Sequence, residues 1–450
     1  MSATAKVLDE APAMGLQTEA PRKRAGLLRG FGPGLVLAMT FLGTGDLISS
    51  SVSGANYGYA LMWTLIVALG ARYCMISAIA KYKLQNRFGD RSLMAGYQRL
   101  WSGFPRFFAA MMLVYGIIVQ AAFLRAGTVG LYELAGRRGG EWGHFWWGLP
   151  IVAVTAIVLT RGSAFRFLEW SARLASIVII GSFVFALVRI GHVDFAALAR
   201  GLTFEVPPDN GPFDALFIAV ATIGTIGGSA ANLLYPYFMA ERGWHGPEHR
   251  REQQFDLRTG MLPLLIINLL IWIVAAETVR DSGITVSSEA GLAAMMERAV
   301  GPAGPSLLWI AFALKAVTSF PAQAHGFARM MFDGLHLGSK RCEGFARVQD
   351  DPWFNRVMIV FLIVTPLLIT VPGAPDLVHI SIFGTSVVTA LTLPPILLGV
   401  LLLTSSRRYM LDAHVNRWWE KLILCVIAAI GIWSLYAILD GLADAIARAT

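Results

Sequence analysis

The residues whose types and spacing most suggest chemistry are Gly43, Thr44, Gly45 and Asp46, which interrupt an otherwise apolar run over residues 31–55. Glycine weakens a helix, because it loses more backbone freedom than any other residue when it becomes helical. An ionisable side chain inside an apolar span is costly, and it usually marks a functional position. The pattern predicts a broken membrane helix with a binding site at Asp46.

A second glycine-rich interruption lies at residues 224–232, within another apolar run. It contains the candidate binding residues Gly227, Gly228, Ser229, Ala230 and Asn232. Unwound backbone in a membrane exposes carbonyl groups and helix ends that can bind an ion or a small substrate. Glycines in membrane helices also serve close helix packing alone, and for one such pair packing is the simpler explanation. Two interruptions, each with polar side chains, favour a transport site.

The elements that must hold these residues are membrane helices. The chain has 450 residues, of which 56% are hydrophobic and 15% charged, and its mean hydropathy is +0.59. A soluble domain carries about 25% charged residues. Apolar runs of about 20 residues recur along the chain, and each is long enough to cross a bilayer. These runs predict an all-α integral membrane protein with about eleven spans, at residues 31–55, 60–82, 106–132, 146–161, 168–191, 213–239, 258–280, 305–333, 355–373, 377–404 and 419–440.

The spans group into two sets of five. Residues 31–191 form the first set and residues 213–404 the second, followed by an extra helix at 419–440. Because five is odd, the second set enters the membrane from the opposite side, as in an inverted repeat. The two interruptions fall in corresponding helices, the first and the sixth. We therefore expect one transmembrane domain over residues 28–440, with residues 1–27 as a flexible cytoplasmic tail.

Most Lys and Arg residues lie in every second loop along the chain. These loops all fall on one side of the predicted membrane. By the positive-inside rule, this side and the N-terminus are cytoplasmic, and an odd number of spans places the C-terminus outside. A bacterial inner membrane suits this pattern. The net charge of +8 is explained by these loops, so no nucleic-acid partner is needed. Residues 289–300 are a candidate short helix outside the membrane.

Several segments of this chain resemble the NRAMP family of divalent metal transporters over about residues 30–440. They are Gly32-Pro33-Gly34, Tyr57-Gly58-Tyr59-Ala60-Leu61-Met62-Trp63, Arg166-Phe167-Leu168-Glu169, Asn232-Leu233, Leu391-Thr392-Leu393-Pro394 and Thr404-Ser405-Ser406-Arg407-Arg408. The resemblance implies a LeuT-like fold with a five-plus-five inverted repeat and broken helices 1 and 6. It also implies secondary-active transport by alternating access.

The sequence departs from this family at the metal ligands. NRAMP proteins carry Asp-Pro-Gly-Asn at the first break, where this chain has Gly43, Thr44, Gly45 and Asp46. They carry Met-Pro-His-Asn at the second, where this chain has Ser229-Ala230-Ala231-Asn232, and a helix 10 glutamine of the family is Thr392 here. The remaining donors are oxygens, with Asp46 and Asn232 as the candidate metal ligands. Oxygen ligands suit hard cations such as Mg²⁺, and Mn²⁺ is also compatible with them.

A lysine near the middle of the predicted eighth span complicates this interpretation. Lys315 lies about ten residues into span 305–333, close to Thr318 and Ser319. In the resembled fold, helix 8 packs beside helix 1. We therefore consider that Lys315 pairs with Asp46, or that it occupies the place where related carriers bind a coupling ion. A lysine that extends to water or faces a wet cleft is the simpler alternative.

Proton coupling is an open expectation. NRAMP relatives carry acidic residues in helix 3, whereas this chain offers Gln120 and Arg125 there. Arg125 is a candidate charge partner, or a residue near the outer end of its helix. His325 is a candidate titrating group, although a lone histidine is more often packed or facing water. Lys315 is the other candidate proton carrier.

Other classes of function fit the sequence poorly. It carries no metalloprotease, nucleophile-elbow or phosphate-loop motif, so we expect neither an enzyme nor a cofactor. The partners expected are the lipid bilayer and a small ion or solute, with protons as a further candidate. The leading prediction is a transporter of a hard divalent cation of the Mg²⁺ or Mn²⁺ class. A transporter of a small organic solute that has lost the metal site is the alternative, and a channel or a non-transporting receptor is the second alternative.

Overall fold

The structure is a computed structural model that describes residues 44–449, apart from residues 91, 161–164, 209–212, 280–281, 283, 338–344 and 346. For Thr44, Glu241 and residues 165–176 and 438–449 it describes the backbone alone. The regular elements of this part of the chain are helices. A single isolated β-bridge pairs Asn86 with Met410. The predicted all-α fold is confirmed. Gly43 and the predicted tail, residues 1–27, lie outside the described residues.

The helices follow the predicted spans closely. The long ones are α2 (Thr44–Tyr57), α3 (Met62–Gln85), α5 (Phe104–Leu134), α6 (Gly143–Thr160), α7 (Phe165–Ile190), α11 (Arg250–Val279), α12 (Glu289–Val300), α13 (Gly304–Leu337), α16 (Thr385–Ser405) and α17 (Trp418–Ala449). The short ones include α4 (Leu93–Leu100), α8 (Phe195–Arg200), α9 (Ala215–Thr222), α10 (Tyr235–Glu241), α14 (Pro352–Val357) and α15 (Leu377–His379). Nine helical stretches of the described chain are long and apolar enough to cross a membrane. The predicted number of about eleven spans stays a prediction.

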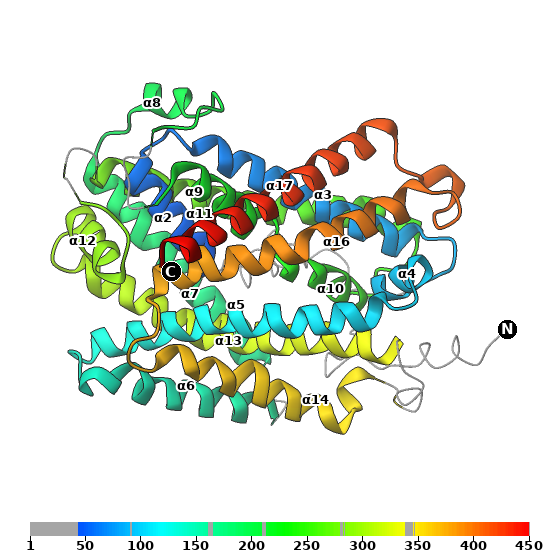
Figure 1. The fold of residues 1–450 in the computed structure, drawn as a ribbon, viewed down its shortest axis with the longest axis horizontal. Coiled ribbons are helices and arrows are strands. Elements are labelled where there is room, and N and C mark those ends of the chain that lie inside the picture. Colours follow the sequence, from blue (N-terminus) through cyan, green and yellow to red (C-terminus); the bar gives the residue numbers. More distant parts are fainter. Residues whose placement is uncertain are drawn as a thin grey trace, which may run out of the picture.

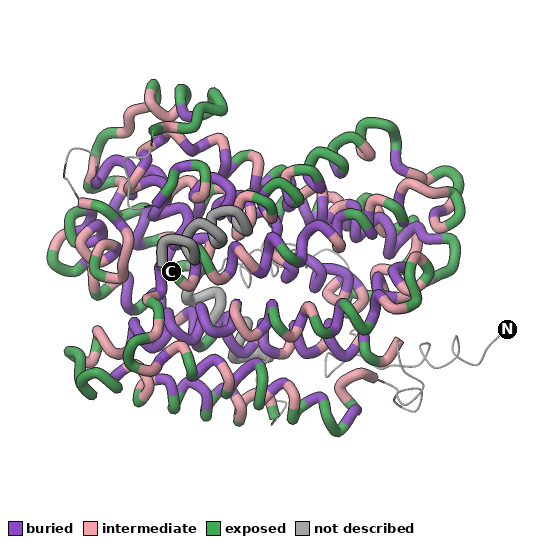
Figure 2. Tube along the Cα trace, viewed as in Figure 1, coloured by how far each residue is buried: buried purple, intermediate pink, exposed green. Residues whose placement is uncertain are grey.

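The long helices lie roughly along one direction, and α5 and α13 run side by side through the centre (Figure 1). On one side of this pair lie α6 and α14, and on the other lie α3, α16 and α17. Buried residues concentrate on the central helices, whereas α6, α14 and α17 expose much of their surface (Figure 2). This arrangement suits a bundle whose outer helices contact lipid.

The loop between α3 and α4 and the loop between α16 and α17 meet at the end of the bundle where α4 lies (Figure 1). Arg87 forms an ion pair with Asp412 at 2.8 Å, and its backbone N–H donates to Tyr409 O at 2.8 Å. Arg250 donates to Ser77 O at 3.0 Å. Segments far apart in sequence thus meet at one end, as expected for loops on the same side of a membrane.

The opposite end carries α8 and α12 (Figure 1). The predicted helix over residues 289–300 is confirmed as α12, whose first turn is capped by Ser288 accepting from Gly291 N at 3.3 Å. Asn56, at the end of α2, makes two hydrogen bonds with the backbone of Val286, at 2.8 and 3.0 Å. The linker before α12 is therefore fastened to the helix that carries Asp46.

Candidate functional site

A cavity of about 50 Å³ lies where the interrupted sixth span faces α2, α5, α13 and α16. Its polar lining includes the carboxylate of Asp46, the hydroxyl groups of Tyr115 and Ser229, and the amide of Gln323. Its other lining residues are Gly45, Val119, Ala122, Phe123, Thr225, Thr385 and Thr389. Five spans thus contribute to one cavity, whose lining combines polar and apolar groups.

The sixth span is broken at its middle, as predicted. Helix α9 ends at Thr222 and passes into a π-helical turn, η4 (Ile223–Gly227), and a short 3-10 helix, η5 (Ala230–Leu234), precedes α10. Between η4 and η5, Gly228 and Ser229 are not helical. A side chain at position 227 would not fit, because its Cβ would lie 2.7 Å from Ala68 O. Glycine here permits the close approach of α3.

Polar side chains form hydrogen bonds with the backbone groups that this break exposes. Ser229 caps η5 by accepting a hydrogen bond from Ala231 N at 3.3 Å. The Asn232 amide donates to Gly227 O at 3.2 Å, and its Oδ1 is buried without a hydrogen-bond partner in the described part of the chain. Backbone groups freed in a membrane must be satisfied from nearby, and these two side chains do so. Asn232 and Ala230 are buried but do not line the cavity.

Tyr115 of α5 is a site residue that sequence reasoning missed. Its hydroxyl lies 3.0 Å from Ser229 Oγ and accepts a hydrogen bond from Ala230 N at 3.2 Å. It therefore holds the unwound segment from across the cavity. A tyrosine in an apolar span is common, so nothing in its local sequence distinguishes Tyr115 from a packing residue.

Asp46 is buried, with 3% of its surface exposed, and its Oδ1 lies 3.7 Å from Nη1 of Arg72. Arg72 lies near the middle of α3 and is 1% exposed. The same Nη1 donates to Ile226 O in η4 at 3.2 Å. Sequence analysis did not single out Arg72, although an arginine deep inside span 60–82 is the kind of signal that identified Lys315.

Lys315 is also buried, with 2% of its surface exposed, and the Asp46 carboxylate acts electrostatically on its ammonium group. Thr318 Oγ1 lies 3.5 Å from Lys315 O, and Ser319 is 1% exposed. These three residues of α13 lie outside the lining of the cavity. The exposure of Lys315 disfavours the alternative in which it reaches bulk water. Asp46 thus lies in the field of two cations, Arg72 and Lys315.

The remaining predicted site residues lie elsewhere. Arg125 forms an ion pair with Glu289 of α12 at 3.0 Å, and Glu289 also accepts from Leu377 N at 2.8 Å, so Arg125 belongs to a contact between helices near the α12 end. His325 stacks edge-on against Phe354, with ring centroids 5.6 Å apart. Thr392 donates to Thr389 O at 3.2 Å within α16. Gly43 lies outside the described residues, and of Thr44 only the backbone is described.

The described polar side chains that line the cavity offer oxygen atoms as metal ligands. Among the described residues there is no cluster of three His, Cys, Asp or Glu side chains that would hold a metal ion. Asp46 is the carboxylate that lines the cavity, and Tyr115, Thr225 and Ser229 supply hydroxyl groups. Such donors suit a hard cation that keeps part of its water shell.

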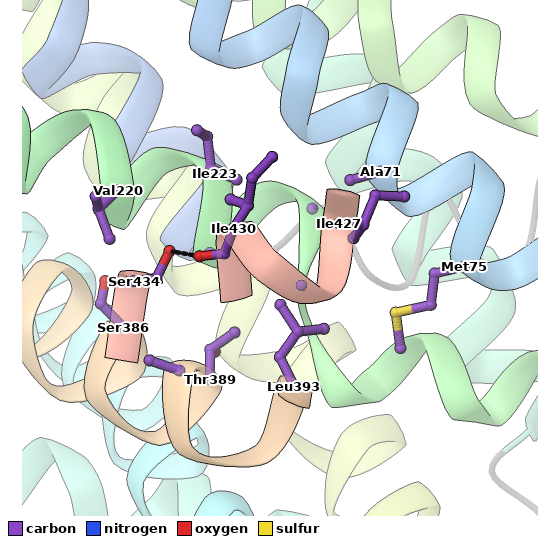
Figure 3. A pocket seen from close by; sticks show the side chains of 14 residues that line it. Ala71, Met75, Val220, Ile223, Ser386, Thr389, Leu393, Ile427, Ile430 and Ser434 are labelled. Atoms are coloured by element: carbon purple, nitrogen blue, oxygen red, sulfur yellow. Dashed lines mark hydrogen bonds between the residues drawn. The ribbon is translucent and has the colours of Figure 1, made fainter. Parts of the chain in front are cut away.

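A second, apolar cavity of about 20 Å³ lies on the other side of the break, between α3, α16 and α17 (Figure 3). Met75, Ile223, Leu393, Ile427 and Ile430 surround it, together with other small and apolar residues. Thr389 lines both cavities. The unwound segment is therefore bordered by a polar space and by an apolar one.

Comparison with known proteins identifies the family. The profile of the family described as "Natural resistance-associated macrophage protein-like" matches residues 34–440. Among curated relatives, "Divalent metal cation transporter MntH" of Nostoc sp. (strain PCC 7120) is 23% identical, over 91% of each chain. The protein of the same name from Brucella suis is 21% identical, over 91% of this chain and 88% of its own.

Solved structures have the same fold. A mutant of the Eremococcus coleocola manganese transporter superposes with a TM-score of 0.74 at 17% identity, over 94% of this chain and 90% of that chain. Mhp1, a nucleobase-cation-symport-1 family transporter, superposes with a TM-score of 0.53 at 15% identity, over 91% of this chain and 93% of its own. These likenesses confirm the predicted integral membrane fold of LeuT-like type. The match of the family profile over most of the chain also confirms the resemblance found in the sequence, and this chain belongs to the NRAMP family.

Proposed function

We propose that this protein is a secondary-active transporter that carries a divalent metal cation across the membrane by alternating access. Its family membership and the names of its curated relatives support this class of cargo. The observation that carries the proposal is the buried carboxylate of Asp46, which lines a polar cavity beside the broken sixth span. A negative charge at an unwound helix in mid-membrane suits the binding of a cation.

We further propose that the cargo is a hard cation of the Mg²⁺ or Mn²⁺ class. Among the described residues that line the cavity, the polar groups are oxygen donors and one amide, and none is a thioether. Thioether ligands favour softer metals, so oxygen donors favour Mg²⁺ and Mn²⁺. At about 10–15 Å³ per water, the cavity of about 50 Å³ has room for an ion with a few of its waters. The binding residues in this proposal are Asp46 and Ser229, and Asn232 joins them if the break rearranges.

An organic solute is a second candidate cargo, favoured by one specific observation. The Asp46 carboxylate is balanced by Arg72 at 3.7 Å and lies in the field of Lys315. The cavity is also much larger than a bare ion. A small solute with an anionic group would suit two buried cations better than a divalent metal would.

The remaining features of the proposal concern placement and partners. We propose that the protein resides in a bacterial inner membrane with a cytoplasmic N-terminus and an external C-terminus, as the Lys- and Arg-rich loops indicate. It works in a lipid bilayer without a cofactor, has no catalytic activity and binds no nucleic acid. Lys315 is the proposed proton carrier if transport is coupled to protons.

Uptake into proteoliposomes tests the proposal. Purified protein is assayed with Mg²⁺, Mn²⁺ and Ca²⁺, each with and without a pH gradient. We expect uptake of at least one cation, and a loss of at least about tenfold in Asp46→Asn, because the neutral amide removes the charge that attracts the ion. Asp412→Asn is the matched control, since this side chain is exposed in a loop. Absence of uptake for all three cations would overturn the proposal, as would full activity in Asp46→Asn.

A further inference from the structure

The buried arginine of α3 joins the site to the break. Arg72 lies near the middle of a 24-residue span and is 1% exposed. An arginine at mid-membrane costs about 2.5–3.5 kcal/mol on insertion scales, so it is retained only where partners or a function favour it. Its partners come from two other spans, Asp46 of α2 and the Ile226 carbonyl of η4. Arg72 is thus positioned by the same two segments that form the proposed binding site.

A single nitrogen of Arg72 makes both contacts. Nη1 lies 3.7 Å from Asp46 Oδ1 and 3.2 Å from Ile226 O. A carboxylate oxygen together with a backbone carbonyl oxygen at a helix break is the kind of donor pair that a hard cation binds. The guanidinium therefore occupies a position between two oxygens that would suit a metal ion.

We propose that Arg72 is a tethered counter-cation that competes with the transported cation for Asp46 and so determines the specificity of the site. This inference rests on the proposed function, in which a cation binds at Asp46. A substrate ion must displace the guanidinium from Asp46, and the apparent affinity falls by the fraction of molecules in which Asp46 is available. The Ile226 carbonyl gives the displaced guanidinium a second partner, so Arg72 need not leave the break when it releases Asp46.

The competing explanation is that Arg72 is only a structural support for the break. The two roles make different predictions for a neutral side chain that still donates hydrogen bonds. Glutamine at position 72 keeps a hydrogen-bond donor but cannot neutralise Asp46. A supporting role predicts a changed stability with unchanged ion affinity. A competing cation predicts tighter ion binding.

The test is isothermal titration calorimetry of the full chain in nanodiscs with Mn²⁺ alone as the probe. We expect Arg72→Gln to bind Mn²⁺ at least about tenfold more tightly than the unaltered protein, because the competing charge is removed. Arg72→Lys keeps the charge and should stay within about threefold. Adding Asp46→Asn to Arg72→Gln should abolish the gain.

Of two further variants, the first distinguishes a charge at position 72 from a positive charge elsewhere near Asp46. The second provides a test if Arg72→Gln does not fold. Lys315→Gln removes one positive charge without emptying the position of Arg72, and we expect a smaller gain from it than from Arg72→Gln. Arg72→Leu removes the charge with a side chain that neither donates a hydrogen bond nor binds a metal, and we expect it to bind Mn²⁺ more tightly than Arg72→Lys. It replaces the test with Arg72→Gln if that variant does not fold.

The outcomes separate this inference from the proposed function. If the unaltered protein binds Mn²⁺ and a folded Arg72→Gln binds it no more tightly, the inference is wrong and the proposed function stands. An equal gain in Lys315→Gln also overturns the inference, because the net charge alone would then explain the effect. If neither the unaltered protein nor any variant binds Mn²⁺, the inference fails together with cation transport.

Discussion

Three buried ionisable side chains, Asp46, Arg72 and Lys315, define the electrostatics of the site, and the sequence marks all three in the same way. Each is a charged residue inside an apolar span. Their depth was predictable from position alone, because an apolar run longer than the bilayer thickness places its centre in hydrocarbon. Which charge meets which was not predictable. The contact between Asp46 and Arg72 depends on how α2 and α3 pack, and local sequence does not encode that packing.

The Tyr115 hydroxyl offers a test of how the break is held. Tyr115→Phe leaves Ala230 N without the hydrogen bond that it now makes at 3.2 Å. An unsatisfied buried donor costs about 1–3 kcal/mol, so we expect a lower unfolding temperature and slower uptake. The control is Tyr132→Phe, whose hydroxyl donates to Gly140 O at 3.2 Å in an exposed loop and should matter little. Equal unfolding temperatures for the two variants would contradict this role of Tyr115.

The interruption of the sixth span was the element best predicted from the sequence. Two adjacent glycines followed by Ser229 predicted a break, and the helix does unwind at Gly228 and Ser229. The ninth span was predicted only as a helix over residues 355–373. It instead passes from α14 through a π-helical stretch, η9 (Met358–Val364), into a 3-10 stretch, η10 (Thr365–Thr370). Such changes of helix type depend on small differences in backbone hydrogen bonding, which hydrophobic patterns do not report.

The contact between α2 and α11 yields a prediction for Gly54. A Cβ at this position would lie 2.6 Å from Trp272 O and 3.0 Å from Ala275 Cβ, so Gly54→Ala must push the two helices apart. Overpacking of this kind costs about 1–3 kcal/mol, and thermal unfolding of the purified variant measures it.

The matched control for this prediction is Gly70→Ala in α3. Nothing lies within 4 Å of the Cβ that it would add, and position 70 is exposed on the outside of the bundle. Alanine favours a helix over glycine by about 1 kcal/mol, so this variant should be as stable as the unaltered protein or slightly more stable. If Gly54→Ala behaved in the same way, the close contact of α2 with α11 would not matter to stability.

At the scale of the whole molecule, the predicted spans were close to the helices because a bilayer imposes both length and polarity on each segment. The packing of Arg87 against Tyr409 and Asp412 brings together two loops that were predicted to lie on the same side of the membrane. The pairing of helices was not predictable. The central place of α5 and α13 arises from contacts between small residues and neighbouring helices, for example at Gly127, where an added Cβ would lie 2.1 Å from Ala316 Cβ.

The proposed orientation can be tested by labelling. Single cysteines are introduced as Ser102→Cys and Glu141→Cys, at exposed positions in different loops, after Cys74, Cys342 and Cys425 have been replaced by serine. A membrane-impermeant maleimide added to intact cells should label Glu141→Cys but not Ser102→Cys, because the positive-inside rule places the loop before α5 in the cytoplasm. The reverse labelling pattern would refute the proposed orientation.

The apolar cavity beside the broken sixth span has a consequence for the thermodynamics of the transport cycle. Empty space of this kind adds to the partial molar volume of the protein without adding mass. A cycle that closes the cavity in one state and opens it in another carries a volume change as well as a free-energy change. Compression favours whichever state packs Leu393 and Ile430 into the smaller space. Hydrostatic pressure is therefore a variable that shifts the equilibrium between the conformational states of this transporter without altering its charged residues.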